Sequence, residues 1–461
     1  MRAEPQACDY RPDTPLAALA PWLADPVQPA PFPQAVLRWR NDRWDRAVGL
    51  DQLDEAAWIN HFARFEPLPG NLPQPLALRY HGHQFRVYNP DLGDGRGFTF
   101  AQLRDGAGRL LDLGTKGSGQ TPWSRTADGR LTLKGAVREV LATEMLEALG
   151  VNTSKTFSVI ETGEELWRQD EPSPTRSAVL VRLSHGHIRI GTFQRLIYLE
   201  EAGHMAELVD YCLAQFPGSE PPEDAPGRDE PAVRLLHQVV ERLARLAGEW
   251  MAAGFVHGVL NTDNMNISGE SFDYGPWRWL PKWDPQFTAA YFDQQGLYAF
   301  GRQPEAVHWN CGQLAVALRL LVPAEPLIFA LNRFAPLYQQ SLARHFVWRL
   351  GLESQGFEAD GAMIAAAERH MRETGLSPDL FFHRHRFGRA SAADDDWAGA
   401  LAGWQPRGAD HALWHEAAPP ALLVDNVERI WAGIAEHDDW SAFTTAIGEI
   451  RALGEALGTP P

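Results

Sequence analysis

The order of its periodic segments constrains the fold of this chain more than any other sequence feature. Strand-like runs of apolar and β-branched residues occupy four segments of its first half: 98–103, 109–116, 156–162 and 177–183. A single helical pattern, residues 136–150, lies between the two pairs of runs, and helical patterns prevail from Thr192 onward. We therefore predict an α+β fold, in which a small β-rich half with one helix precedes a larger α-helical half.

Turn and cap residues mark the ends of several of these segments. The Asp-Gly pair at 105–106 suits a hairpin turn between the first two strand-like runs. Gly150 is placed to end the first helix, and Gly254 to end a strongly amphipathic helix over residues 232–253. Residues 217–231 combine prolines with acidic side chains, which favours an exposed loop.

These segments divide the chain into three parts. Residues 1–60 are rich in proline and only weakly periodic, so we expect an N-terminal extension that packs on the main body. Residues 61–200 form the β-rich part, and residues 201–461 form the helical part.

Charge and cysteine content exclude several classes of protein. The chain has 59 acidic and 42 basic residues, a net charge of −17, which argues against general binding to nucleic acid or to anionic lipid. Its three cysteines, Cys8, Cys212 and Cys311, are too few and too far apart for a disulfide framework or a cysteine-rich zinc site. The first residues do not resemble an export signal, and prolines and charges interrupt the most apolar stretch, 314–331. We expect a soluble cytoplasmic protein without nucleic-acid or membrane partners.

Two features of the β-rich part could bind phosphate. The glycine-rich run 93–97 allows backbone N–H groups to approach phosphate oxygens, and Arg96 within it could add a charged contact, although such runs are also ordinary turns. Lys116 ends a strand-like run, and Glu139 follows 23 residues later in the first helix. A strand lysine held by a helix glutamate contacts nucleotide phosphates in kinases, but the same spacing also fits an exposed ion pair of little consequence.

The run from Gly254 to Asn264, GFVHGVLNTDN, resembles the catalytic loop of kinases, HRDxxxxN, and Asp273-Tyr-Gly follows it as a metal-binding DFG would. Val259 occupies the position of the usual catalytic aspartate. Asp263 is the nearest carboxylate, so either it acts as the base from a shifted position or the site is inert. Asn264 and Asp273 offer the oxygen ligands that Mg²⁺ prefers.

Other polar residues are more ambiguous. Arg182 and Arg189 follow the last strand-like run seven positions apart, and they could reach one polyphosphate or simply serve solubility. The alternating histidine pairs at 81/83 and 185/187 lack a spaced carboxylate or cysteine, which favours packing and hydrogen bonding over metal binding.

Taken together, these motifs resemble the selenoprotein O family, the YdiU-type protein adenylyltransferases, which have a two-lobed protein-kinase-like fold. The similarity covers about residues 78–315 through the following strings: YHGHQF, LGDGRG, DLGTKGSGQTPWSRTADGR, VREVLATE, RLSHGHIRIGTF, GFVHGVLNTDNMNI, FDYGPW and GRQPEAVHWN. The resemblance implies a β-rich N-lobe with one key helix and a helical C-lobe.

The resemblance also implies a reaction and roles for residues. ATP would be held in a reversed orientation, so that AMP is transferred to a tyrosine, serine or threonine hydroxyl of a protein substrate and pyrophosphate is released; UTP stays open as a second nucleotide. Asp263 would accept the proton, Glu139 would orient Lys116, and Asn264 and Asp273 would bind Mg²⁺ or Mn²⁺. The implied nucleotide pocket consists of Gly93, Gly95, Arg96, Lys116, Asp128, Gly129, Arg182, Arg189 and Asp273.

The chain departs from the family pattern in a few places. His81 replaces a glycine of the usual YGGHQF, and Leu297 replaces the arginine of a GRY triplet. No cysteine follows Cys311, which argues against the C-terminal redox switch of many family members, and the last hundred residues match only loosely. Two alternatives to adenylyl transfer stay open: an ordinary phosphotransferase acting on a protein or small molecule, and a non-catalytic nucleotide-binding pseudokinase.

Overall fold

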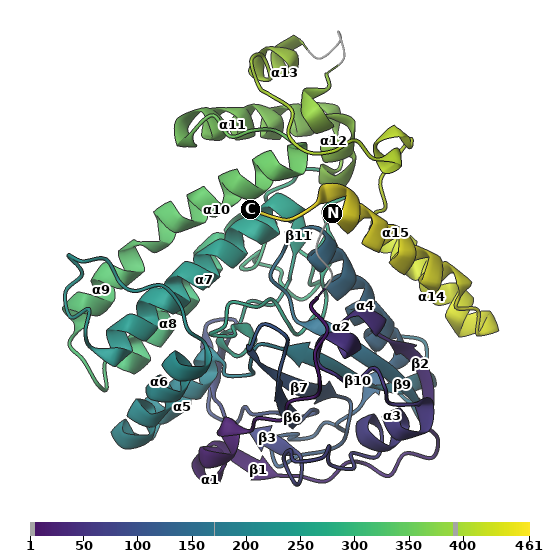
Figure 1. Cartoon of the computed structure of the whole chain (residues 1–461), viewed down its shortest axis with the longest axis vertical. Coiled ribbons are helices and arrows are strands. Elements are labelled where there is room, and N and C mark those ends of the chain that lie inside the picture. The colour runs from purple at the N-terminus through teal and green to yellow at the C-terminus, as the bar shows by residue number, and fades with distance from the viewer. Residues whose placement is uncertain (1–4, 170, 391–394) are drawn as a thin grey trace.

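The computed structural model of the chain describes residues 5–169, 171–390 and 395–461. Most of its strands gather in one β-sheet portion and most of its helices in a separate portion, with the sheet in the lower half of Figure 1 and helices α7, α8 and α10 above it. The α+β class predicted from the order of the segments is therefore confirmed.

One antiparallel sheet forms the β-rich portion. Its strands follow the order β1-β3-β6-β7-β10-β9-β2, and β8 pairs separately with β10. The hairpin predicted around residues 105–106 joins β6 to β7. The strands of this sheet are β1 (Ala24–Pro26), β2 (Val36–Arg40), β3 (Leu76–Leu78), β6 (Thr99–Arg104), β7 (Leu110–Lys116), β8 (Leu131–Thr132), β9 (Lys155–Leu166) and β10 (Thr175–Ser184). Two small ribbons lie outside it, one formed by β4 (Gly82–Gln84) and β5 (Val87–Asn89), the other by β11 (Phe255–Val256) and β12 (Arg278–Trp279).

Side chains of β10 alternate between two hydrophobic layers, because successive residues of a strand point to opposite faces. Ala178 and Leu180 join the layer that contains helix α4, whereas Val179 and Val181 join the layer that contains Trp58 and Phe62 of α3. The sheet is thus covered on both faces.

The helix predicted over residues 136–150 begins earlier than its sequence pattern indicates. Helix α4 spans Leu133–Ala148, because the Thr132 side chain accepts a hydrogen bond from Gly135 N at 3.1 Å and so caps the N-terminus. Gly150 follows the end of α4 with φ +79°, and Gly254 ends α7 in the left-handed conformation predicted for it.

Residues 5–60 contribute to both faces and edges of the sheet portion. β1 pairs with β3 at one edge, β2 pairs with β9 at the other, and α3 covers one face.

In the helical portion, α7 packs along α8 and α10, while α15 packs against α4 (Figure 1). The helices are α1 (Ala20–Leu23), α2 (Asp42–Ala47), α3 (Glu55–Phe62), α4 (Leu133–Ala148), α5 (Ile190–Tyr198), α6 (Ala202–Gln215), α7 (Pro231–Ala253), α8 (Gln303–Leu318), α9 (Ala324–Asn332), α10 (Phe334–Leu350), α11 (Phe357–Thr374), α12 (Pro378–Arg384), α13 (Asp395–Ala400), α14 (Val424–His437) and α15 (Ser441–Leu457).

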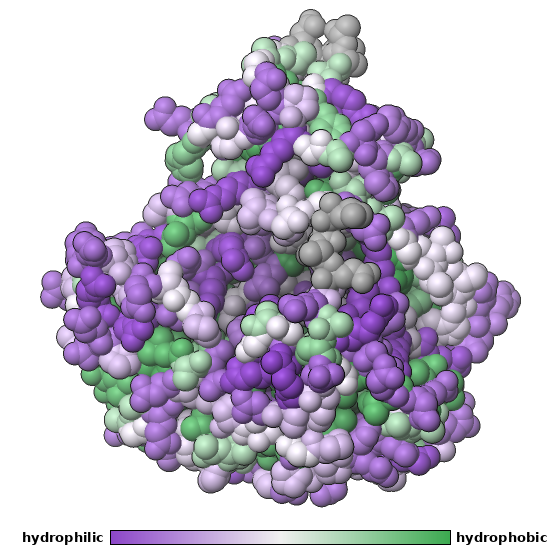
Figure 2. All heavy atoms as spheres, viewed as in Figure 1, coloured by the Kyte–Doolittle hydropathy of each residue, from purple (hydrophilic) through white to green (hydrophobic). Residues whose placement is uncertain are grey.

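The surface is largely polar, as expected when most apolar side chains are buried in these layers. The face shown in Figure 2 is mostly hydrophilic, with hydrophobic residues in small separate patches. Within the described ranges, no helix combines the length and apolar character that a membrane span requires. The connection between α6 and α7 contains no helix or strand, as predicted for residues 217–230, whereas Pro231, the last residue of the predicted loop, begins α7.

Candidate functional site

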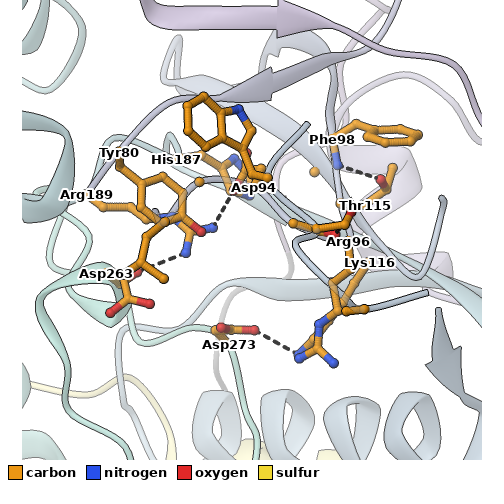
Figure 3. A pocket seen from close by; sticks show the side chains of 18 of the residues that line it. Tyr80, Asp94, Arg96, Phe98, Thr115, Lys116, His187, Arg189, Asp263 and Asp273 are labelled. Carbon is orange, nitrogen blue, oxygen red and sulfur yellow. Dashed lines mark hydrogen bonds and ion pairs between the residues drawn. The ribbon is translucent and has the colours of Figure 1, made fainter. Parts of the chain in front are cut away.

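A cavity of about 320 Å³ lies where the sheet portion meets the loops of the helical portion. The sheet portion supplies the glycine-rich run 93–97, the end of β7 and Arg182 of β10, while Asp263 and Asp273 come from loops between α7 and α8. Figure 3 shows these side chains converging from the different elements. The volume fits a small ligand rather than a folded partner.

The glycine-rich run packs closely against its neighbours. A Cβ on Gly93 would lie 2.3 Å from the Trp123 ring, and one on Gly97 would lie 2.1 Å from the Thr115 carbonyl oxygen. Any side chain at these positions would therefore displace the cavity wall. Asp94, between them, accepts a hydrogen bond from Leu78 N and pairs with Arg189 at 3.0 Å, which fixes the run against the rest of the site.

Lys116 lies at the centre of a buried charge cluster. Its Nζ is 2.7 Å from Glu139 Oε2 on α4 and 2.8 Å from Asp273 Oδ1. The side chains of Lys116 and Glu139 are 4% and 1% exposed. The sequence spacing thus corresponds to a real ion pair, and its burial excludes the exposed pair that was the alternative.

A two-stranded ribbon holds the loop that carries both aspartates. β11 and β12 pair antiparallel, so residues 257–277 form one closed connection. Within it, His257 contacts the Phe272 carbonyl through Nε2 at 2.9 Å, and Asp273 adopts φ +61°, a conformation uncommon outside glycine. Strained residues of this kind concentrate at functional sites, where the surroundings hold them in place.

Asp273 is ionised by its surroundings. Burial alone would raise the pKa of its carboxyl, but the nearby charges of Lys116, Arg182, Arg96 and Arg189 hold that pKa well below its usual range. Its side chain keeps 24% of its surface exposed, toward the cavity that it lines. Asp273 is therefore a permanent anion at neutral pH.

Asp263 has the opposite character. It lies in the short 3₁₀ turn η2 (Thr262–Asn264), and its Oδ1 is buried without a hydrogen-bond partner among the described residues. Burial raises its pKa from 3.8 to about 6, and the charge of Arg189 offsets only part of that rise. A carboxylate with this pKa and an unpartnered oxygen in a cavity can accept a proton near neutral pH.

Arg182 and Arg189 both point into the site. From the sequence alone, both arginines could also have been surface residues that serve solubility. Arg182 Nη1 lies 3.7 Å from Glu139 and from Asp273, and its Nε and Nη1 make no hydrogen bond among the described residues. Arg189 donates to the Asp263 carbonyl at 2.9 Å and stacks on the Tyr80 ring. Buried guanidinium nitrogens that lack hydrogen bonds among the described residues indicate an anionic ligand at the cavity.

The cavity is electropositive in a strongly acidic chain. Five cationic side chains line it, against three carboxylates from Asp94, Asp263 and Asp273. A phosphate-bearing ligand would complement this excess of positive charge. The cationic residues are Arg96, Lys116, Arg125, Arg182 and Arg189.

Four sequence-derived site residues do not line the cavity. Glu139 lies behind Lys116, and Asn264 donates from Nδ2 to the Val259 carbonyl at 3.1 Å. Asp128 forms an ion pair with Arg168 at 2.8 Å and is 47% exposed, while Gly129 accepts a hydrogen bond from Gly119 N. Ala127 is the residue of this segment that reaches the cavity.

The histidine pairs make hydrogen bonds within the protein. His81 contacts the Tyr88 hydroxyl at 2.7 Å, His83 contacts Gln194, His185 contacts the Leu110 carbonyl and His187 contacts Asp112. No group of three potential metal-ligating His, Cys, Asp or Glu side chains occurs in the described part of the chain.

Sequence reasoning missed several lining residues. Asp94 was available within LGDGRG, but its partner Arg189 lies 95 positions away, so no local pattern connects them. Tyr80 and Trp123 are aromatic residues whose place at the cavity depends on tertiary packing. His187 belongs to a pair that the sequence assigned to packing, and it lines the cavity as well.

The chain matches the model of one protein family and is similar to several known proteins. A family model described as "Protein adenylyltransferase SelO" matches residues 7–418. The chain is 40% identical to the protein nucleotidyltransferase YdiU of a Synechocystis species, over 95% of this chain and 97% of that protein. It is 46% identical to YdiU of Synechococcus elongatus, over 95% and 94%, and 47% identical to YdiU of Trichodesmium erythraeum, over 73% and 71%.

Proposed function

The chain belongs to the SelO family of protein adenylyltransferases, and we propose that it transfers AMP from ATP to a hydroxyl side chain of a protein substrate. One observation carries the assignment of this reaction to the cavity. Asp263, with an unpartnered oxygen and a pKa of about 6, shares the cavity with a cluster of cations suited to a polyphosphate.

In the proposed reaction, the hydroxyl oxygen of a tyrosine, serine or threonine attacks the α-phosphorus of ATP. A new oxygen–phosphorus bond forms, the bond between the α-phosphorus and the oxygen bridging to the β-phosphorus breaks, and pyrophosphate leaves. The hydroxyl proton passes to Asp263 Oδ1. This role for Asp263 accounts for Val259 at the position of the usual kinase aspartate.

We assign a reversed orientation to the nucleotide. The α-phosphate then lies beside Asp263, and the β- and γ-phosphates face Lys116, Arg182 and Arg189. The glycine-rich run would contact the nucleotide through Gly93, Gly95 and the Arg96 side chain. The unpartnered Arg182 Nε and Nη1 and Arg189 Nε support this assignment, since phosphate oxygens would complete their hydrogen bonds.

We further propose that the two portions of the chain correspond to the lobes of a protein-kinase-like fold. The ion pair between Lys116 on a strand and Glu139 on a helix supports this correspondence, as does the position of the cavity at the junction of the portions. In this arrangement Glu139 orients Lys116 and has no contact with the nucleotide itself.

The donor atoms near the cavity suit Mg²⁺ or Mn²⁺. Asp273 offers a carboxylate, and Asn264 uses only its Nδ2 in the hydrogen bonds that the structure describes, which leaves its amide oxygen available. Two hard oxygen ligands from the protein, with phosphate oxygens and water completing the shell, are typical of magnesium bound with nucleotide. A bound ion would neutralise charge on the phosphates.

We assign Asp128 and Gly129 to the nucleotide pocket because they close a loop that contributes to the wall of the cavity. Gly119 N donates to the Gly129 carbonyl, Arg168 holds Asp128, and the same segment places Ala127 at the cavity. In this proposal the two residues act by positioning the cavity wall.

The test compares ATP labelled in the α-phosphate with ATP labelled in the γ-phosphate. Wild-type protein and Asp263→Asn are incubated with each nucleotide, Mg²⁺ or Mn²⁺, and a mixture of proteins that includes the chain itself. We expect label in protein from the α-position only, lost in Asp263→Asn. Label from the γ-position alone would make the chain a phosphotransferase, and nucleotide binding without any transfer would make it a pseudokinase.

A further inference from the structure

The YHGHQF motif, residues 80–85, contains β4 of the hairpin β4–β5, and the turn that follows β4 carries two residues in an uncommon conformation. Phe85 and Arg86 both have positive φ, +49° and +64°. Consecutive non-glycine residues with positive φ are costly, and surrounding contacts must hold them there. The sequence singled out this motif, but the reaction proposed above uses none of its residues.

Hydrogen bonds tie the hairpin to the loop that carries Asp263. His83 N donates to Thr262 Oγ1 at 2.7 Å, and Phe85 N donates to Asn261 Oδ1 at 3.0 Å. A Cβ on Gly82 would lie only 3.4 Å from Asp263 Cβ. The tip of the hairpin is therefore held at a fixed place beside the proposed base.

Exposed aromatic side chains adjoin this tip. Tyr291 is 83% exposed and Phe292 is 48% exposed, with their ring centroids 5.1 Å apart. Phe85 packs on Phe292 at 5.9 Å, and beneath them Tyr298 donates to the same Asn261 Oδ1 at 2.8 Å. We call Phe85, Tyr291 and Phe292 the aromatic ledge.

The aromatic ledge lies beside the cavity but outside it. Gln84 lines the cavity, whereas none of the three ledge residues does. A nucleotide in the cavity would therefore leave the ledge uncovered. Solvent-exposed aromatic rings next to a reactive group are typical of surfaces that bind a partner.

We propose that the aromatic ledge binds the acceptor segment of the protein substrate, by holding a large apolar residue adjacent to the hydroxyl-bearing residue. This inference rests on the proposed function. A hydroxyl can reach Asp263 only if the substrate backbone passes within one side-chain length of it, and the residues flanking that hydroxyl then lie over the hairpin tip. The exposed rings of Tyr291 and Phe292 can pack against apolar side chains of these flanking residues, without a charged contact.

The probe is a set of short peptides with a central tyrosine, serine or threonine and varied flanking residues, assayed with α-labelled ATP. We expect wild type to prefer peptides with a large apolar residue next to the acceptor. Tyr291→Ala/Phe292→Ala should erase that preference and raise the KM for the preferred peptide about tenfold, with kcat changed less than about twofold. ATP binding should not change, because neither residue lines the cavity.

Val316→Ala/Ile328→Ala is the matched control. These residues are 56% and 54% exposed on α8 and α9, so the variant removes a similar kind of exposed apolar surface elsewhere. It should retain the wild-type preference and KM.

Three outcomes would overturn the inference, and they differ from one another. Peptides labelled without a flanking preference, or with a preference that survives in Tyr291→Ala/Phe292→Ala, would remove the role of the ledge and leave the proposed function intact. A wild-type dimer in sedimentation velocity that the double variant abolishes would assign the ledge to a second copy of the chain. No label in any peptide or protein from α-labelled ATP would overturn the proposed function itself, and the ledge with it.

Discussion

Two of the three aspartates that line the cavity, Asp263 and Asp273, have contrasting surroundings. Asp273 is held by Lys116 at 2.8 Å and lies near three arginines, which keep its pKa well below the usual range. Asp263, ten positions earlier, has an unpartnered oxygen, and burial raises its pKa to about 6. In the proposed reaction, the same type of side chain is therefore a fixed anion in one place and a proton acceptor in the other.

In the proposed reaction, this difference gives the two ends of the site distinct tasks. At the compensated end around Asp273 the buried charges are paired, and the cations there would bind phosphate. At the uncompensated end, the buried carboxyl of Asp263 costs folding free energy and would act as the base. Pairs of carboxylates whose pKa values are driven apart commonly identify the acid–base residues of enzymes.

The largest effect is expected when the aspartate at each end is replaced by asparagine, which removes the carboxylate charge. Asp263→Asn should lower kcat for AMP transfer by about 10²–10⁴-fold, because a general base is lost, while ATP affinity stays within about threefold. Asp273→Asn should instead weaken the binding of ATP with Mg²⁺ as well, because in the proposed arrangement the metal ion loses a carboxylate ligand. Steady-state kinetics with calorimetric ATP binding separate the two. Equal loss of ATP affinity in both variants would contradict the division into two ends.

Breaking the compensated end should destabilise the fold. Lys116→Met leaves Glu139 buried without its cation, and we expect a loss of about 3 kcal/mol in the free energy of unfolding, toward the low end for a broken buried pair because Arg182 remains nearby. Urea unfolding without nucleotide measures the change. The control is Lys134→Met, whose partner Glu428 is 46% exposed and whose loss should cost at most about 1 kcal/mol. Similar costs for the two variants would mean that burial of the cluster contributes little.

The sequence predicted the compensated end better than the uncompensated one. Lys116 and Glu139 belong to a strand and a helix separated by one connection, so their spacing alone suggested contact. The conformation of Asp273 and the unpartnered state of Asp263 Oδ1 depend on packing between segments far apart in the chain, which no local pattern contains. From the residues alone, Asp263 was singled out as the nearest carboxylate to a position where valine replaces aspartate, and its role as proton acceptor came from the family resemblance.

The same reasoning applies to the fold. Long elements such as α7 and β10 were predicted close to their observed bounds, because period and cap residues agree there. β1 and β2 were not predicted as strands, since three and five residues beside prolines carry too little periodicity, and only pairing with β3 and β9 defines them. Asp94 went unassigned for a related reason, because its partner Arg189 lies 95 positions away in the chain.

The two ends should also respond oppositely to pH. A carboxyl whose pKa is higher in the folded state destabilises the fold as pH rises from about 4 to about 6, whereas Asp273, whose pKa is lowered, stabilises it above about 4. In unfolding without nucleotide and with a chelator, Asp263→Asn should match wild type near pH 4 and exceed its stability by about 2 kcal/mol at pH 7. A difference that is independent of pH would contradict the raised pKa of Asp263.

The smallest effect is expected at Asp128, because this carboxylate belongs to neither end of the site. Its ion pair with Arg168 is half exposed, so Asp128→Ala should change the free energy of unfolding by no more than about 0.5 kcal/mol. If Asp128 acts by holding the loop that carries Ala127, ATP affinity should fall about threefold, and Arg168→Ala should reproduce that loss, since it releases the same loop. A loss seen only in Asp128→Ala would mean that this carboxylate contacts the nucleotide directly, and the proposal that it acts through the loop would be wrong.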